Sequence, residues 1–392
     1  MGRKLQMAGK KKFKYCVFGN GMGATIAYHL MHEHDTEVVY LSDIEYAQAR
    51  KTTQRLTFLA DPSAAQCIPM KYASGDNIEP NFFKQFDVII SALPAKYNLP
   101  LAEFAIANGI HYCDLGGVLS VTQDIVKAAE GKDLHSSIIT DCGLMPGRDM
   151  IIARKLIDLV RIVPNEPIEE LTIYVGGIPQ KPHPPLYYDR VYSTAGLKHI
   201  CFDPVYVLRN GEIVVDEPFS EYGVTVIPSL AKFSPNKDGE VEFFNTAGSS
   251  IAPWTFQKLG VRNFSEKTIR WRRFVDFVRS IPPENFERDI ESHINRPINK
   301  DNPDLVWTRV VAKSNSGHIE MDLLDLFDPK TGFTAMQRST GFSAAIVAEM
   351  AARGELKNGC FTPDEAMTSE VLDSYFQKIK KIFINNMSAS FK

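Results

Sequence analysis

The sequence lacks any long apolar run, which excludes a membrane-spanning helix, because such a helix needs about 20 consecutive apolar residues. It also lacks an excess of either charge, since 44 basic and 47 acidic side chains leave a formal net charge of −3. Broad electrostatic attraction to nucleic acid is therefore not expected. Internal repeats are absent as well. We predict neither a membrane nor a nucleic-acid partner.

Cysteine is scarce, with six residues scattered along 392. None forms a C-x-x-C pair, so neither a zinc motif nor a disulfide framework is indicated. The basic N-terminal segment has no apolar core of the kind that an export signal carries. We interpret residues 1–14 as a solvated basic tail. Together these features predict a protein of the reducing cytoplasm.

Strand and helix signals alternate over residues 15–150. The apolar runs there are separated by helical stretches, as a parallel sheet requires. This pattern predicts an α/β fold with a doubly wound parallel, Rossmann-type sheet. The expected strands are YCVF (15–18), EVVYLSD (37–43), DVIISALP (87–94), IHYCDLGG (110–117) and SIITDCG (137–143).

Residues 151–334 show a different pattern. Asn210-Gly211 lies between two short apolar runs, which is a tight-hairpin signal. A second hairpin is expected over 305–327, with a helix over 266–280 between the two. We predict an inserted α+β substrate and dimerisation domain here, followed by C-terminal helices over 335–392.

The stretch FGNGMGATIAYHL (18–30) has the spacing of a dinucleotide-binding loop. Gly19 and Gly21 fit the start of the motif, but the third small residue is either Gly23 or Ala24. With Gly23 in that place, an alanine follows four residues later and a leucine three beyond that, as the helix register requires. We therefore interpret Gly23 as the residue that packs the helix on its strand.

Asp43 ends the second predicted strand, at the spacing where an acidic residue meets the adenosine ribose. A carboxylate there repels a 2′-phosphate, so NAD is the expected cofactor and NADP is less favoured. Other cofactor contacts are expected at the carboxyl ends of the parallel strands. The predicted cofactor-binding residues are Gly19, Asn20, Gly21, Met22, Gly23, Asp43, Ser91, Ala92, Leu93, Pro94, Leu115 and Gly116.

Four segments resemble the saccharopine dehydrogenase family, and most closely its lysine 6-dehydrogenase-like branch. They are SALPAKYNLPLAEFAIANGIHYCDLGG, DCGLMPG, IYVGGIPQKPHPPLYYDRVYSTAGL and EKTIRW. The resemblance implies an NAD(P)-binding domain interrupted by a substrate and dimerisation domain, with the C-terminal helices returning to the first domain. It also implies hydride transfer from an amine-bearing carbon, giving an imine that water opens.

Asp114 and Cys142 follow adjacent predicted strands, where either could take the proton that an amine must lose before hydride transfer. Alternatively, Asp114 anchors loop backbone and Cys142 is a buried small residue. His183, in the proline-rich segment, is a third catalytic candidate, with an exposed turn as its alternative.

Arg190 and Arg270 are candidates to pair with a substrate carboxylate through a two-pronged guanidinium contact. Tyr188, Thr246 and Ser249 complete the predicted substrate-binding residues. The substrate itself is expected to be a small amino acid.

No metal site is predicted. HLMHEHD (29–35) offers three histidines, but we interpret them as the positively charged end of the first helix. The middle domain carries Trp254, Trp307 and several phenylalanines, more apolar surface than a one-sided sheet would expose. A homodimer is therefore predicted.

The resemblance, together with Asp43, favours NAD-dependent oxidative deamination of an amino acid, with the ε-amine of L-lysine first. One alternative is a saccharopine- or carboxynorspermidine-type reductase that joins an amine to an aldehyde. Another is a catalytically silent dinucleotide-binding protein.

Overall fold

The computed structural model describes residues 11–72, 79–161, 163, 166–383 and 387–391. Seven parallel strands within these residues form a first sheet, in the order β15-β6-β5-β4-β1-β2-β3. This order is that of a doubly wound sheet and confirms the predicted Rossmann-type fold. The strands are β1 Phe13–Phe18, β2 Thr36–Asp43, β3 Gln66–Lys71, β4 Val88–Ser91, β5 His111–Asp114, β6 Ser137–Ile139 and β15 Gly359–Phe361.

The central strands of this sheet are buried on both faces, because helices cover both. Tyr15 to Phe18 of β1 and all of β4 are buried. Of the predicted basic tail, residues 1–10 lie outside the described residues, whereas Phe13 and Lys14 already belong to β1. The helices of this part are α1 Asn20–Met31, α2 Tyr46–Leu59, α3 Pro80–Phe83, α4 Asn98–Asn108, α5 Leu119–Ala129 and α6 Arg148–Val160.

A second, mixed sheet follows, with the order β10-β11-β12-β7-β13-β14-β16 in the described chain and the β8–β9 hairpin paired to β12. Both predicted hairpins are present, as β8–β9 and β13–β14. Its strands are β7 Ile168–Pro179, β8 Val205–Arg209, β9 Glu212–Asp216, β10 Gly223–Val226, β11 Glu240–Asn245, β12 Phe264–Trp271, β13 Asp304–Ser314, β14 His318–Leu326 and β16 Met387–Phe391. Among its helices are α7 Thr194–Phe202, α8 Ala252–Lys258, α9 Phe274–Arg279 and α10 Phe286–Glu291.

The prediction of a helix over residues 266–280 is wrong. Its first part is the strand β12, and only Phe274–Arg279 is helical. Every residue of β12 is buried, because the strand lies inside the sheet between β11 and β7. The charged residues of this strand resemble the polar face of an amphipathic helix, so the local pattern predicts a helix. Pairing with the neighbouring strands overrides that local preference.

One face of the second sheet lies over α6. Thr268 of β12 and Thr308 of β13 are both register partners of Val175 in β7, so the three residues share that face. The Thr308 hydroxyl accepts a hydrogen bond from Arg148 and donates one to Asp149, both in the first turn of α6. The inward-facing residues of β12 are therefore directed toward the first sheet.

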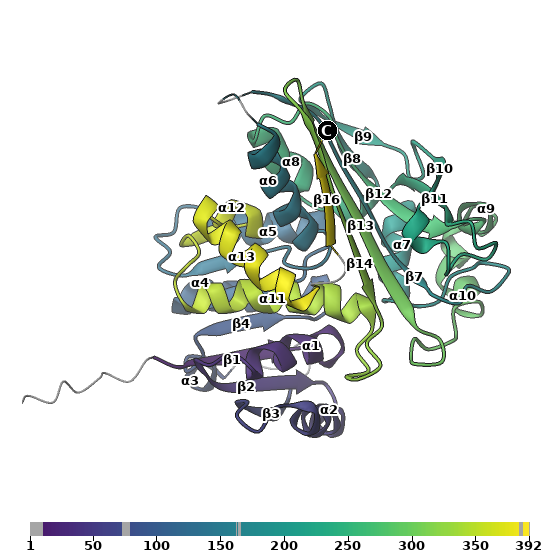
Figure 1. Ribbon diagram of the computed structural model, residues 1–392. Helices are drawn as coiled ribbons and strands as arrows, with labels where there is room; N and C mark the ends of the chain where they lie inside the picture. The colour runs from purple at the N-terminus through teal and green to yellow at the C-terminus, as the bar shows by residue number, and fades with distance from the viewer. Residues whose placement is uncertain (1–10, 73–78, 162, 164–165, 384–386, 392) are drawn as a thin grey trace, which may run out of the picture.

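The C-terminal segment contacts both sheets (Figure 1). Its long helix α11 (Ala335–Ala352) packs tightly on α1, where Gly341 leaves no room for a side chain beside Thr25. The segment then adds β15 to the first sheet and β16 to the second. Two further helices, α12 (Pro363–Ala366) and α13 (Ser369–Ile382), lie between these strands in the chain. Among the described residues, no helix has the length and apolar character needed to cross a bilayer.

Candidate active site

The loop between β1 and α1 is built to approach a phosphate group. Gly19 precedes α1 with φ of 97°, and a Cβ there would lie 2.6 Å from the carbonyl oxygen of Ala92. A Cβ on Gly21 would meet nothing within 4 Å, so the surface above the helix start is open. The first turn has neither a side-chain cap nor an acidic residue. Its free N–H groups suit the pyrophosphate of a dinucleotide.

Gly23 is the residue at which α1 packs on the sheet. A Cβ there would lie 2.8 Å from Cγ1 of Val17 in β1. The geometry agrees with the interpretation of a loop with its packing glycine at position 23. Asn20 and Met22 lie in the same first turn of the helix, and Gln337 of α11 donates a hydrogen bond to the carbonyl oxygen of Gly21.

Asp43 is the last residue of β2, as the sequence indicates, and its Oδ1 accepts the backbone N–H of Glu45. On β4, which lies on the other side of β1 from β2, Ser91 is buried and donates to the Asn98 side chain at 2.7 Å. Ser91 therefore fixes the start of α4, and the more exposed residues after it (92–94) form the rim that a cofactor could contact.

Asp114 lies at the end of β5 and is buried with a second carboxylate, Asp141, which the sequence analysis did not single out. One Asp114 oxygen accepts the N–H of Gly116 at 2.7 Å and that of Asp141 at 3.2 Å. Gly116 has room only for hydrogen, because a Cβ there would collide with Asp141. Asp114 therefore anchors its loop, and this structural role is compatible with a chemical one. A sequence pattern could have identified Asp141: an acidic residue follows each of two adjacent strands, in CDLGG and TDCGL.

Burial raises the pKa of Asp114 to about 7, and the nearby charge of Asp141 adds to this rise. Burial likewise raises the pKa of Asp141 to about 6, against hydrogen bonds from Ser250, Gly117 and Thr122 that lower it. Two carboxyl groups at adjacent strand ends can therefore gain or lose a proton near neutral pH.

Cys142 is unsuited to the role of a base. Its side chain is fully buried, and burial raises the pKa of the thiol well above its usual range. The sequence analysis valued the thiol for a pKa near neutrality, and the apolar surroundings remove that property. The thiol keeps its proton and points toward the carbonyl oxygen of Ile139.

The candidate site residues of the proline-rich segment differ in their exposure to solvent. His183 and Arg190 are exposed, whereas Tyr188 is buried. Within the described residues, no hydrogen bond or ion pair joins the His183 side chain to Asp114. The structure therefore corresponds to the exposed-turn alternative for His183.

Arg270 is buried without a carboxylate partner among the described residues. Its guanidinium lies over the ring of Tyr188 at 4.9 Å and that of Phe274 at 5.2 Å. It donates to the hydroxyl of Tyr192 at 3.2 Å, and its Nε has no partner. Glu266 is near enough for the two charges to interact but forms no ion pair with Arg270, so the guanidinium can still bind an incoming anion.

Thr246 precedes the short turn η3 (Ala247–Ser249), which Ser249 ends, and both residues are buried. The Thr246 hydroxyl donates to Glu266 of β12 at 2.7 Å, a carboxyl group whose pKa burial raises to about 7. Glu266 was missed because its segment was expected to be helical. As a strand, EKTIRW places Glu266 and Arg270 on one face.

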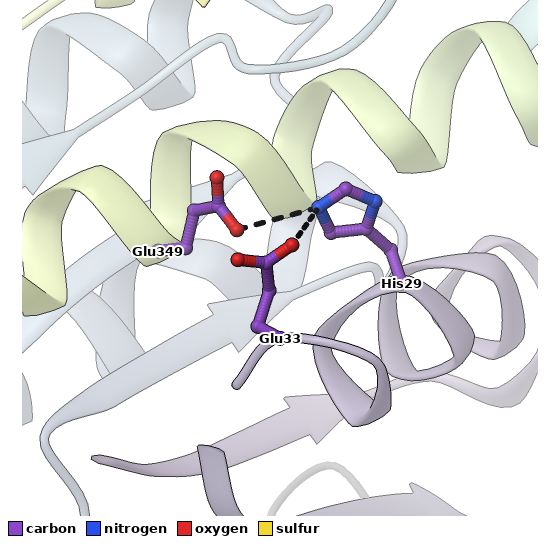
Figure 2. A group of neighbouring side chains, drawn as sticks. All are labelled: His29, Glu33 and Glu349. Carbon is purple, nitrogen blue, oxygen red and sulfur yellow. Dashed lines mark hydrogen bonds and ion pairs between the residues drawn. The ribbon is translucent and has the colours of Figure 1, made fainter. Parts of the chain in front are cut away.

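The histidine-rich end of α1 forms an ion-pair cluster (Figure 2). The ring of His29 lies between Glu33 and Glu349, with Nε2 3.4 Å from the buried Glu349. Lys378 and Arg353 also pair with Glu349. Two permanent cations already balance these carboxylates, so a divalent metal ion fits this cluster poorly.

Comparison with known proteins supports one family. Residues 143–384, more than half of the chain, match the family described as the saccharopine dehydrogenase C-terminal domain. The chain belongs to the saccharopine dehydrogenase family.

The relatives found are distant. Mitochondrial alpha-aminoadipic semialdehyde synthase of Mus musculus is 21% identical over 96% of this chain and 47% of its own length. The Bos taurus protein of the same name is 28% identical over 33% of this chain and 14% of its own length. The chain therefore spans about half the length of the mouse relative.

Among solved structures, apo saccharopine dehydrogenase (L-Glu forming) from Saccharomyces cerevisiae is similar with a TM-score of 0.72 and 15% identity. The match covers 97% of this chain and 100% of that one. At this identity the likeness shows a shared fold over the whole chain.

Proposed function

We propose that this saccharopine dehydrogenase family member oxidises an amino acid at an amine-bearing carbon, with the ε-amine of L-lysine as the first substrate and NAD as the cofactor. The observation that carries the proposal is Arg270, a buried guanidinium without a carboxylate partner in the described chain. An amino-acid carboxylate would complete its charge and its unpartnered Nε.

A bound nicotinamide dinucleotide supplies the hydride acceptor. The open surface at Gly21 and the uncapped start of α1 would hold its pyrophosphate, and Asp43 its adenosine ribose. The amine of lysine has an ordinary pKa of about 10.4 and must lose a proton before hydride can leave the adjacent carbon. Asp114, with a pKa raised to about 7, is the group that would take it.

A second candidate function is a saccharopine-type reaction, in which an amine and an aldehyde are joined or separated. It is favoured by the relatives and by the yeast structure, whose names refer to aminoadipic semialdehyde and saccharopine. One sequence feature argues against this second candidate. Ala95 follows Pro94, at a position where saccharopine reductases often have tyrosine.

Turnover assays distinguish the two candidates. The purified chain is incubated with NAD or NADP and with lysine, saccharopine or an amine–aldehyde pair, and the reduced cofactor and ammonia are measured. Ammonia release from lysine supports the first candidate. Turnover of saccharopine without ammonia supports the second, and cofactor binding without any turnover contradicts both.

A further inference from the structure

Glu266 of β12 carries a buried carboxyl group that the proposed mechanism does not use. The side chain is 3% exposed, and its Oε2 accepts a hydrogen bond from the Thr246 hydroxyl at 2.7 Å. Its Oε1 accepts a second one, from the Thr268 hydroxyl at 3.4 Å. Within the described residues, no lysine, arginine or histidine forms an ion pair with Glu266. The two hydroxyls therefore meet part of the hydrogen-bonding capacity of a carboxylate but supply no positive charge.

The same face of β12 carries a charge of the opposite sign. Glu266, Thr268 and Arg270 are alternate residues of one strand, so their side chains lie on one face. Four residues of a strand separate the Cα atoms of Glu266 and Arg270 by about 13 Å. A direct ion pair would offset the cost of burying both charges, but none joins them in the described chain. The face therefore offers one binding position for an anion and another for a cation.

The turn η3 leaves space beside the Glu266 carboxyl group. A Cβ on Gly248 would lie 3.2 Å from Glu266 Oε2, so any larger residue there would press on the carboxyl group. The residues that follow this turn, Ser250 and Ile251, donate hydrogen bonds to Asp141. One short segment thus contacts both Glu266 and the carboxyl pair at the edge of the first sheet. A group bound to Glu266 would lie beside the proposed site of proton removal.

An ammonium group fits the cation position. It has three N–H donors, and the oxygens of Glu266, Thr246 and Thr268 are acceptors close to one another. The α-ammonium of an amino acid is attached to the same carbon as the carboxylate. When Arg270 binds that carboxylate, the α-ammonium stays near Arg270. Only an amine at the far end of the side chain would reach Glu266.

We propose that Glu266 binds the ammonium group of an ω-amino acid whose carboxylate is bound by Arg270. The inference rests on the proposed function, because it names the residue that distinguishes a terminal amine from other substrate groups. Thr246 and Thr268 orient the Glu266 carboxylate, and Asp114 remains the group that takes the proton. The spacing along β12 then sets the length of substrate that fits.

The test is titration calorimetry of the full chain, alone and with excess NADH, which cannot accept a hydride. The two probes are 6-aminohexanoate and hexanoate, which have the same chain length but differ in the terminal amine. We expect the wild type to bind 6-aminohexanoate about tenfold or more tightly than hexanoate, the usual effect of a hydrogen bond between charged groups. Glu266→Gln should remove this preference and leave hexanoate affinity unchanged, because the amide keeps the shape but not the charge. Arg270→Met should weaken the binding of both probes.

Two controls accompany this test. Glu166, which precedes β7, is also a buried glutamate that accepts a hydroxyl, that of Ser316 at 2.8 Å. Glu166→Gln should therefore keep the preference of the wild type. The shorter 4-aminobutanoate should bind more weakly than 6-aminohexanoate, because its amine does not reach Glu266. Unfolding midpoints and the retained hexanoate affinity show that the variants are folded.

Three outcomes overturn the amine site: no saturable binding of 6-aminohexanoate, no preference of the wild type for it over hexanoate, or the same preference in Glu266→Gln. The proposed function is tested separately by turnover. Turnover of an amine substrate with an unchanged preference in Glu266→Gln leaves the function intact and removes the amine site. A preference that depends on Glu266, without turnover, supports the amine site and contradicts the function.

Discussion

Single buried side chains determine the chemistry that this site can perform. Three carboxyl groups of the site are buried, those of Asp114, Asp141 and Glu266. Carboxyl groups are normally ionised at neutral pH, but burial raises the pKa of each of these toward neutrality. Arg270 is a buried charge of the opposite sign. Such groups are stable only with partners, and a substrate amino acid offers a partner to each kind.

The effect of Asp114 on stability has a definite sign. Its folded pKa of about 7 exceeds the ordinary 3.8, so the folded chain holds this proton more tightly than the unfolded chain does. Its contribution is fully present below about pH 4 and is lost as pH rises through about 7. Asp114→Asn removes this dependence and keeps an oxygen that accepts the loop N–H groups.

From about pH 5 to about pH 8, the unfolding free energy of the wild type should therefore fall by about 3 kcal/mol relative to Asp114→Asn. Urea denaturation at several pH values measures this difference. Turnover of the variant should fall roughly 10²-fold with little change in NAD affinity. Normal turnover with parallel stability curves would leave Asp114 as a loop anchor alone.

Replacement of Arg270 tests the carboxylate contact. Arg270→Met keeps apolar packing on Tyr188 and Phe274 but removes the charge. The loss of a charge-assisted bond should cost about 2–4 kcal/mol of transition-state binding, seen as a lower kcat/KM on the true substrate. Arg190→Met, at an exposed position, is the comparison and should have the smaller effect. Equal kcat/KM in Arg270→Met and the wild type would remove Arg270 from the site.

Asp43 tests the choice of cofactor. Because its carboxylate ends β2 at the expected ribose position, Asp43→Ser should weaken NAD binding and relatively improve NADP binding. Dissociation constants for both dinucleotides, measured by fluorescence titration, check this. A wild type that strongly prefers NADP contradicts the assignment.

At the scale of elements, the packing of α1 on β1 requires a residue without a side chain at position 23, which is Gly23. Gly23→Ala places a Cβ 2.8 Å from Val17, so the helix must shift, and we expect a loss of about 1–3 kcal/mol in unfolding free energy. Gly21→Ala has open space and should keep the stability while weakening NAD binding. Thermal unfolding and NAD titration of both variants separate the two roles, and equal stability losses would contradict this assignment.

The strand β12 shows what an element contributes beyond its local pattern. Read as a helix, 266–280 places Glu266 and Arg270 on one face, because they are four residues apart, but turns Thr268 to the opposite side. As a buried strand, it directs both, with Thr268, toward the first sheet. The pairing partners that make it a strand lie 22 to 30 residues upstream in β11 and 93 upstream in β7, so no local window contains them.

At the scale of the whole molecule, the homodimer remains a prediction, but its first argument fails. Trp307 is buried within the second sheet, and Trp254 is half-buried against Tyr206. Among the strands of the second sheet, exposed apolar side chains lie on β9 and on the edge strand β10, with Val215 at 59% and Val226 at 57% exposure. An edge with exposed valines is suited to pairing with a second copy.

Light scattering of the full chain should therefore give the mass of a dimer, and Val226→Lys should shift it toward the monomer, because a charge on an edge strand opposes pairing. Lys232→Ala, outside the edge strand, is the control. A wild type that is monomeric at micromolar concentration contradicts the prediction.

The sequence by itself determined the parallel sheet, the glycine loop and the family. Buried strands, close helix packing and open approach to a phosphate each require particular residues at short spacing, so a local pattern reveals them. Only the tertiary structure decided which groups meet: the Asp114–Asp141 pair, the buried Arg270 on its aromatic rings, and Glu266 beside the Thr246 hydroxyl. These groups come from segments far apart in the chain, and their charge states depend on burial, which arises only when the two sheets pack together.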